Sequence, residues 1–111
     1  MNTIENQDLP VAGQLKQVIT EVVYQNQLLG RKPIATDALY QKVKEFLNLS
    51  DEQMDQQYPY GGGKVADKIR AAYHQLKIDG VMNGSKHGVL EFTDSAFKKY
   101  DELKKLANKN N

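Results

Sequence analysis

The sequence predicts a mainly α-helical domain with one small β-hairpin, in the α+β class. Several segments carry apolar residues at helical spacing, and prolines and glycines separate them. Two short apolar stretches with glycine-rich turn residues between them then indicate a hairpin. With 111 residues the chain is long enough for one core, so we expect a single domain over 10–106. Residues 1–9 are expected to be a flexible N-terminus and residues 107–111 a frayed tail.

The composition is typical of a folded protein without disulfides. Hydrophobic residues make up 40% of the chain and charged residues 26%, which favours a globular protein over a disordered one. The absence of cysteine excludes disulfides and thiolate metal sites and fits a cytoplasmic location. The first ten residues lack the basic and apolar regions of a signal peptide, and the apolar runs are too short to cross a membrane. We therefore expect no membrane association.

The first predicted helix covers about residues 11–29. Pro10 suits a first helical turn, and Gly30 suits the position just beyond a helix end. Between them the apolar residues follow the i, i+3, i+4 spacing of an amphipathic helix. This stripe comprises Leu15, Val18, Ile19, Val22 and Val23.

A second helix is predicted over about residues 37–47. Thr36 is a suitable N-cap, and Asp37 in the first turn suits the positive end of the helix dipole. One or two residues of strand near Ile34, just before the cap, would give the later hairpin a third strand. The expected buried face of the helix comprises Leu39, Val43, Phe46 and Leu47.

A short third helix has the most specific start signal in the chain. Ser50 and Gln53 have the spacing of a capping box, and Leu49 and Met54 flank them as a hydrophobic staple. These residues predict a helix over about 51–57. The proline and three glycines that follow must end it, because both residue types destabilise the interior of a helix.

The fourth predicted helix, residues 64–78, has two distinct faces. Apolar residues share one narrow arc at about 100° per residue, and Gly80 is placed as the C′ residue beyond the helix end. The apolar arc comprises Val65, Ile69, Ala72 and Leu76, with Tyr73 at its border. The opposite arc comprises Asp67, Arg70, Ala71 and His74, with Lys64 and Lys77 at its edges.

A hairpin and a last helix complete the chain. Residues 81–82 and 89–92 are predicted to be two strands, because asparagine, glycine and serine supply turn chemistry between them. Either Thr93 or Asp94 is suited to cap the last helix. The expected apolar face of that helix comprises Phe97, Tyr100, Leu103 and Leu106.

The predicted order is helix, short strand, three helices, hairpin and helix. This is the layout of a winged helix-turn-helix with an added short helix and a C-terminal helix. In that fold the helix before the hairpin enters the DNA major groove, and the hairpin, or wing, here about 81–93, follows the DNA backbone. Residues 64–89 carry five lysines or arginines and two aspartates, a net charge of +3, against +1 for the whole chain. This local surplus favours nucleic acid as the partner.

Three stretches also carry a family resemblance: LNLSDEQMDQQYPYGGG, KVADKIRAAYHQLKIDGVM and GVLEFTDSAFKKY. They are similar to the N-terminal domain of Mrr-type restriction endonucleases, and the similarity extends over about residues 10–103. The resemblance implies a winged-helix DNA-binding module, and the family's nuclease domain has no counterpart in this sequence. The family usually has tryptophan at the position of Ala71. Its wing is often richer in arginine than Ser85-Lys86-His87, which predicts weaker phosphate binding here.

We predict that the chain binds double-stranded DNA, as a transcription regulator or a DNA-targeting module without catalysis. Arg70 and His74 are the main candidates for reading base edges, and the lysines are candidates for phosphate contacts. The candidate DNA-binding residues are Lys64, Lys68, Arg70, Ala71, His74, Lys77, Lys86 and His87. We expect no catalytic residues, no metal and no cofactor.

Other interpretations of these residues remain open. A winged helix can also bind a separate protein partner through the same helix and wing, and the small charge surplus together with Asp67 supports that alternative. A homodimer through the first or last helix is a further alternative. Glu102-Leu103-Lys104 imitates part of a nuclease site, but it lies on a predicted helix with Leu103 in the apolar stripe.

The loop before the fourth helix has two interpretations as well. Gly61-Gly62-Gly63-Lys64 lacks the spacing and the hydroxyl residue of a Walker loop, so a tight turn is favoured over a nucleotide site. Tyr58 and Tyr60 flank Pro59, and they are suited either to contact a sugar or phosphate or to cover an edge of the core.

Overall fold

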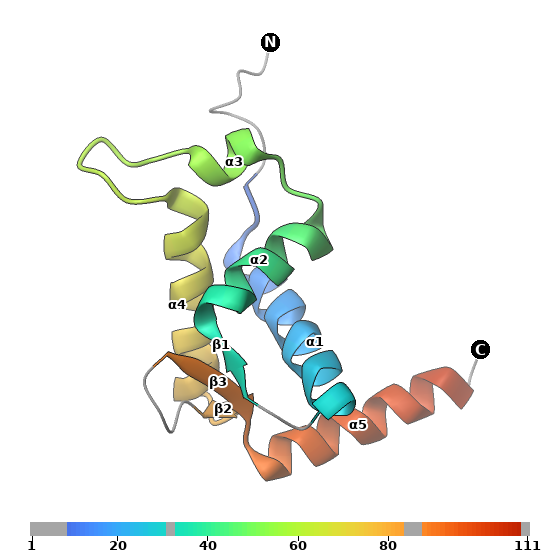
Figure 1. Cartoon of the computed structure of the whole chain (residues 1–111). Coiled ribbons are helices and arrows are strands. Elements are labelled where there is room, and N and C mark those ends of the chain that lie inside the picture. Colours follow the sequence, from blue (N-terminus) through green and yellow to red (C-terminus); the bar gives the residue numbers. More distant parts are fainter. Residues whose placement is uncertain (1–8, 31–32, 84–87, 110–111) are drawn as a thin grey trace.

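The structure, a computed structural model, describes residues 9–30, 33–83 and 88–109. These residues form five α-helices and a small three-stranded antiparallel sheet (Figure 1). The elements are α1 (Ala12–Gly30), β1 (Ile34–Ala35), α2 (Thr36–Leu47), α3 (Asp51–Asp55), α4 (Lys64–Ile78), β2 (Met82–Asn83), β3 (Val89–Phe92) and α5 (Asp94–Lys109). The predicted α+β class, mainly helical, is confirmed. The expected flexible segment 1–9 lies, except for Leu9, outside the described residues.

Helix α1 is the centre of the core. It packs against α2, α4 and β3, and the predicted stripe from Leu15 to Val23 is buried. Helix α4 lies along it and buries Val65 and Ile69 completely. Full burial of a side chain of this size contributes about 1.5–3 kcal/mol, so the α1–α4 contact is a main source of stability.

Helix α2 ends at Leu47 as predicted, but its start and the burial of one residue differ from the prediction. Thr36 is already the first helical residue, and Ala35 is the N-cap without a side-chain hydrogen bond. The reason is that β1 runs directly into α2, and both the backbone N–H and the hydroxyl of Thr36 donate to Gly88 O, at 2.9 and 3.3 Å. Phe46 was expected to be buried but is 56% exposed, whereas Leu47, expected on the same face, does pack against the core.

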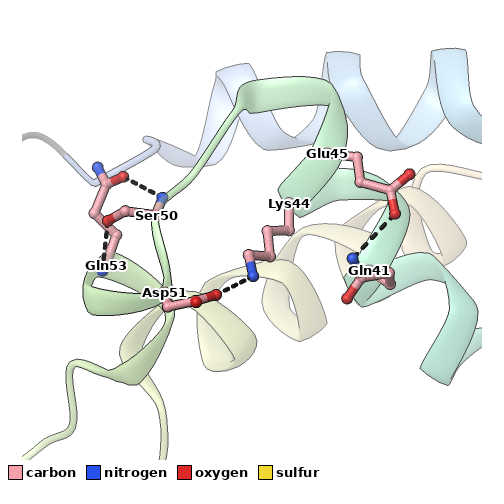
Figure 2. A network of polar contacts seen from close by, with 6 residues as sticks. All are labelled: Gln41, Lys44, Glu45, Ser50, Asp51 and Gln53. Carbon is pink, nitrogen blue, oxygen red and sulfur yellow. Dashed lines mark hydrogen bonds and ion pairs between the residues drawn. The ribbon is translucent and has the colours of Figure 1, made fainter.

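The corner between α2 and α3 is held by side chains (Figure 2). The predicted capping box is confirmed: Ser50 Oγ accepts from Gln53 N–H at 3.0 Å, and Gln53 Oε1 accepts from Ser50 N–H at 2.8 Å. Lys44 reaches across from α2 to Asp51 and lowers the pKa of that carboxyl. Helix α3 ends at Asp55, two residues earlier than predicted, because Gln57 pairs with Gly63 instead.

The sheet has the order β1-β3-β2, so the hairpin does gain a third strand. In this sheet Leu90 is paired with Ile34, and Phe92 with Met82. The predicted C′ glycine is also confirmed: Gly80 has φ +78°, its N–H donates to Lys77 O, and Val81 N–H donates to Leu76 O. These two bonds form a Schellman motif, which directs the chain from α4 straight into β2.

Helix α5 is attached to α1 by aromatic rings and polar contacts. Thr93 caps it by accepting from Ala96 N–H at 3.4 Å. Tyr24 on α1 lies 5.5 Å from the Phe97 ring and 5.0 Å from the Tyr100 ring. Its hydroxyl donates to Asp101 at 2.8 Å. The side of α5 that bears residues 97, 100, 101 and 104 therefore faces α1.

This orientation contradicts part of the predicted apolar face of α5. Leu103 and Leu106 are 56% and 57% exposed, because they lie on other sides of the helix than the docked residues. The helix also continues to Lys109, three residues beyond the expected limit of the domain. Figure 1 shows this end of α5 extending away from the rest of the fold.

Glu21 is the polar centre of the α1–α5 contact, and its replacement tests that contact. Burial would raise the pKa of Glu21, but hydrogen bonds from Gln25, Tyr100 and Lys104 outweigh it and lower the pKa below 4.5. A lowered carboxyl pKa stabilises the fold above about pH 4.5, and this contribution is lost as the pH falls through the folded-state pKa. Glu21→Gln should therefore cost about 1 kcal/mol at neutral pH and much less near pH 3, measured by urea denaturation at both pH values. An equal loss of unfolding free energy at both pH values would show that the charge of Glu21 does not stabilise the fold.

Candidate nucleic-acid interface

The two faces of α4 are those that the sequence predicts. Val65, Ile69, Ala72 and Leu76 are buried against the core, and Tyr73 is buried with them. The opposite side exposes Asp67, Arg70, Ala71 and His74. Lys64, Lys68 and Lys77 are half-buried along the edges of this exposed face. The helix therefore presents a polar, partly cationic surface that is held in place by its apolar side.

Both ends of α4 are held by neighbouring backbone. At the amino end, the N-cap Gly63 has no side chain to accept a capping bond, and Lys64 N–H donates to Gln56 O at 2.9 Å. At the carboxyl end, the Schellman motif at Gly80 leads into β2. A helix fixed at both ends is preorganised, so little conformational entropy would be lost when a partner binds its exposed face.

The exposed face contains one weak ion pair. Arg70 Nη1 lies 3.6 Å from Asp67 Oδ1, and Tyr58 donates its hydroxyl to Asp67 Oδ2 at 3.2 Å. The Arg70–Asp67 pair is solvent-exposed, so it contributes at most about 1 kcal/mol. Arg70 can therefore exchange this carboxylate for a phosphate or a guanine edge at low cost.

Two lysines at the edges of the face lie against tyrosine rings. Lys64 Nζ is 5.9 Å from the centroid of Tyr58, and Lys77 Nζ is 5.4 Å from that of Tyr73. Such contacts hold the aliphatic stems on the protein while the ammonium groups stay in water. Burial, together with a hydrogen bond to Tyr40, raises the pKa of Tyr73, so this ring remains neutral beside Lys77.

The loop before α4 is a short closed hairpin, which we call the tyrosine hairpin (residues 57–63). Its ends pair through Gln57 and Gly63, and two further backbone bonds cross it, from Tyr58 N–H to Gly62 O and from Gly61 N–H to Tyr58 O. Gly61 and Gly62 have φ of +95° and +92°, a conformation that other residues adopt only with strain. In Figure 1 the loop projects from the fold at the amino end of α4.

Helix α4 also exposes a large apolar residue that was not among the sequence candidates. Ile78 is 77% exposed and lies four residues after His74, so it continues the face that bears Arg70 and His74. Helical spacing alone could have identified it, because Ile78 falls outside the buried arc of the same helix. An exposed isoleucine adds an apolar contact at the carboxyl end of the face.

The predicted wing contacts Lys86 and His87 lie outside the described residues. The strands β2 and β3 on either side of them are paired, Met82 with Phe92 and Asn83 with Glu91. Lys104, from the nuclease-like triplet, donates to Glu21 at 2.9 Å on the α1–α5 side of the fold. Within the part of the chain that the structure describes, no group of three His, Asp or Glu residues is arranged to hold a metal. No described helix has the length and apolar character needed to cross a bilayer.

Comparison with known proteins found no matching family model, no curated relative and no similar solved structure.

Proposed function

We propose that the chain binds double-stranded DNA as a winged helix-turn-helix protein, with α4 in the major groove and the β2–β3 hairpin on the backbone. The observation that supports this most directly is the exposed face of α4. It presents Arg70 and His74 between cationic edges, while its other face is anchored in the core. We propose a role as a transcription regulator or DNA-targeting module without catalysis.

The topology supports the same proposal. The order from α1 to β3 and the strand order β1-β3-β2 are those expected when a recognition helix precedes a wing, with α3 as an added helix and α5 as an extension. Both features also agree with the resemblance to the N-terminal domain of Mrr-type restriction endonucleases. The major groove is wide enough to admit α4.

Each candidate residue has a separate role in the proposed complex. Arg70 and His74 reach base edges, and Ala71 between them allows close approach to the groove and a contact with a thymine methyl. The phosphate contacts come from Lys64 and Lys77 at the edges of the face, with Lys68 at its flank and Lys86 and His87 at the wing.

Replacement of Arg70 tests the proposal. Fluorescence anisotropy with random-sequence duplex DNA across a salt series should show wild-type binding that weakens steeply as salt rises, because phosphate binding releases counterions. Arg70→Ala should bind about tenfold more weakly, since one strong base or phosphate contact is lost. The matched control is Lys105→Ala, which removes one charge from the exposed end of α5. Absence of duplex binding by folded wild-type protein at low salt would overturn the proposal.

The competing function is a protein-interaction module that uses the same face. The exposed Ile78 and the Asp67–Arg70 pair favour this alternative, because both suit a mixed apolar and charged partner surface. Ile78→Ser distinguishes the two functions. It should change the affinity for DNA by no more than about twofold but substantially weaken the binding of a protein partner. The salt dependence of that protein complex would also be shallower than that of DNA.

A further inference from the structure

The tyrosine hairpin carries two rings stacked on each other outside the core. The centroids of Tyr58 and Tyr60 are 5.1 Å apart and their planes differ by 5°. Tyr60 is 84% exposed. Neither ring belongs to the described core or to the side chains packed against it, so the role of covering a core edge is excluded for Tyr60. A ring that is fixed in position and open to water is available to stack on a flat ligand.

The stack is held in place by the surrounding backbone and side chains. The bond from Gly61 N–H to Tyr58 O closes a turn with Pro59 and Tyr60 at its centre, and proline is favoured at that position because its φ is already fixed. The hydroxyl of Tyr58 is bound to Asp67 on α4. Burial and this hydrogen bond raise the pKa of Tyr58. Tyr58 therefore supports one face of the Tyr60 ring, and the opposite face remains open.

The charge beside the stack suits a nucleotide. Lys64 Nζ lies 5.9 Å from the centroid of Tyr58, at the amino end of α4, where the helix dipole favours an anion. A flat aromatic face next to a cation complements a base attached to its phosphate. An aliphatic or acidic partner would use only one of these two features.

We propose that Tyr60, supported by Tyr58, is a stacking site for one unpaired DNA base adjacent to the duplex that α4 binds. The proposal rests on the proposed function, because α4 brings the duplex to the hairpin. Neighbouring bases cover every base face inside an intact duplex. An exposed ring therefore finds a partner only where a base is unpaired or a step is kinked. The protein would then recognise a distorted site in duplex DNA.

The experiment compares two labelled DNAs of the same random-sequence pool by fluorescence anisotropy. One is an intact duplex, and the other carries a single unpaired adenine at its centre. Wild-type protein should prefer the bulged duplex by roughly 5- to 150-fold, the range expected for one base–aromatic stack. The ratio of the two affinities should stay constant between low and moderate salt, because stacking adds no phosphate contact.

Three variants test whether the Tyr60 ring causes the preference for the bulged duplex. Tyr60→Ala should bind the intact duplex like the wild type but lose the preference, and Tyr60→Phe should keep it. Phe46→Ala, which removes an exposed ring from α2, should also keep it. With 2-aminopurine as the unpaired base, its fluorescence should be quenched by the wild type and by Tyr60→Phe but not by Tyr60→Ala.

The failures of the two proposals are distinguishable. Salt-dependent binding to the intact duplex without preference for the bulge would overturn the stacking site and leave the proposed function standing. Two results with Tyr60→Ala would also overturn the stacking site. Equally weakened binding to both DNAs would show that the ring contacts the DNA backbone, and an unchanged preference for the bulge would show that the ring contacts no DNA. Absence of binding to either duplex would overturn both proposals.

Discussion

Tyr24→Ala is expected to destabilise the protein by about 3–5 kcal/mol, the usual cost of deleting a buried aromatic ring. Tyr24 is 5% exposed, and its ring contacts Phe97 and Tyr100 on α5. Deletion leaves a cavity between α1 and α5 and also removes the hydrogen bond to Asp101. Urea denaturation followed by circular dichroism measures the loss. A cost below about 1 kcal/mol would show that α5 does not depend on this ring.

Tyr24→Phe is the matched control, because it removes only the hydroxyl. It should cost about 1 kcal/mol near neutral pH. The hydrogen bond to Asp101, together with burial, raises the pKa of Tyr24 from 10.0 to about 12. A raised pKa stabilises the fold below pH 10, and this contribution is lost as the pH rises toward 12. The difference between the wild type and Tyr24→Phe should therefore shrink over that alkaline range.

The double variant Lys64→Ala, Lys77→Ala is expected to weaken duplex binding on the order of 50-fold at about 0.1 M salt. The two lysines lie at opposite ends of the exposed face of α4, so each is placed for a separate phosphate. Loss of two phosphate contacts should also reduce the slope of log affinity against log salt by about 2. Anisotropy titrations at several salt concentrations measure both quantities.

The control for this double variant is Lys98→Ala, Lys99→Ala. It removes the same charge from two exposed positions on α5, a different helix from α4. If the effect of the first variant is local, the control should change affinity only a few-fold. Equal losses in the two variants would show that net charge alone drives binding, and α4 would then lose its assigned role.

Local signals in the sequence predicted most of the helices well. The capping box at Ser50 and the glycine at position 80 each depend on a few neighbouring residues, so the sequence contains everything that decides them. The two faces of α4 follow from helical spacing and were likewise predictable. The same spacing placed Leu103 and Leu106 in a buried stripe, which was wrong.

Two of the errors share one physical cause, which is contact between residues distant in the sequence. Thr36 does not cap α2 because its donors reach Gly88, 52 residues away. The exposure of Leu103 follows from the bond between Tyr24 and Asp101, which joins residues 77 positions apart and sets the rotation of α5. Periodicity describes one element at a time and carries no information about such contacts.

Local signals in the sequence placed each helix to within a few residues and identified which residues of α4 are available to a partner, because capping and periodicity act within one or two turns. The packing of the elements against one another decided which side of α5 is buried, the register in which Ala35 pairs with Val89, and the exposure of Tyr60 on a closed hairpin. These features depend on contacts between separate elements. Capping and periodicity cannot choose between two similar faces of one helix or loop, and packing against the rest of the fold decides which of them is buried.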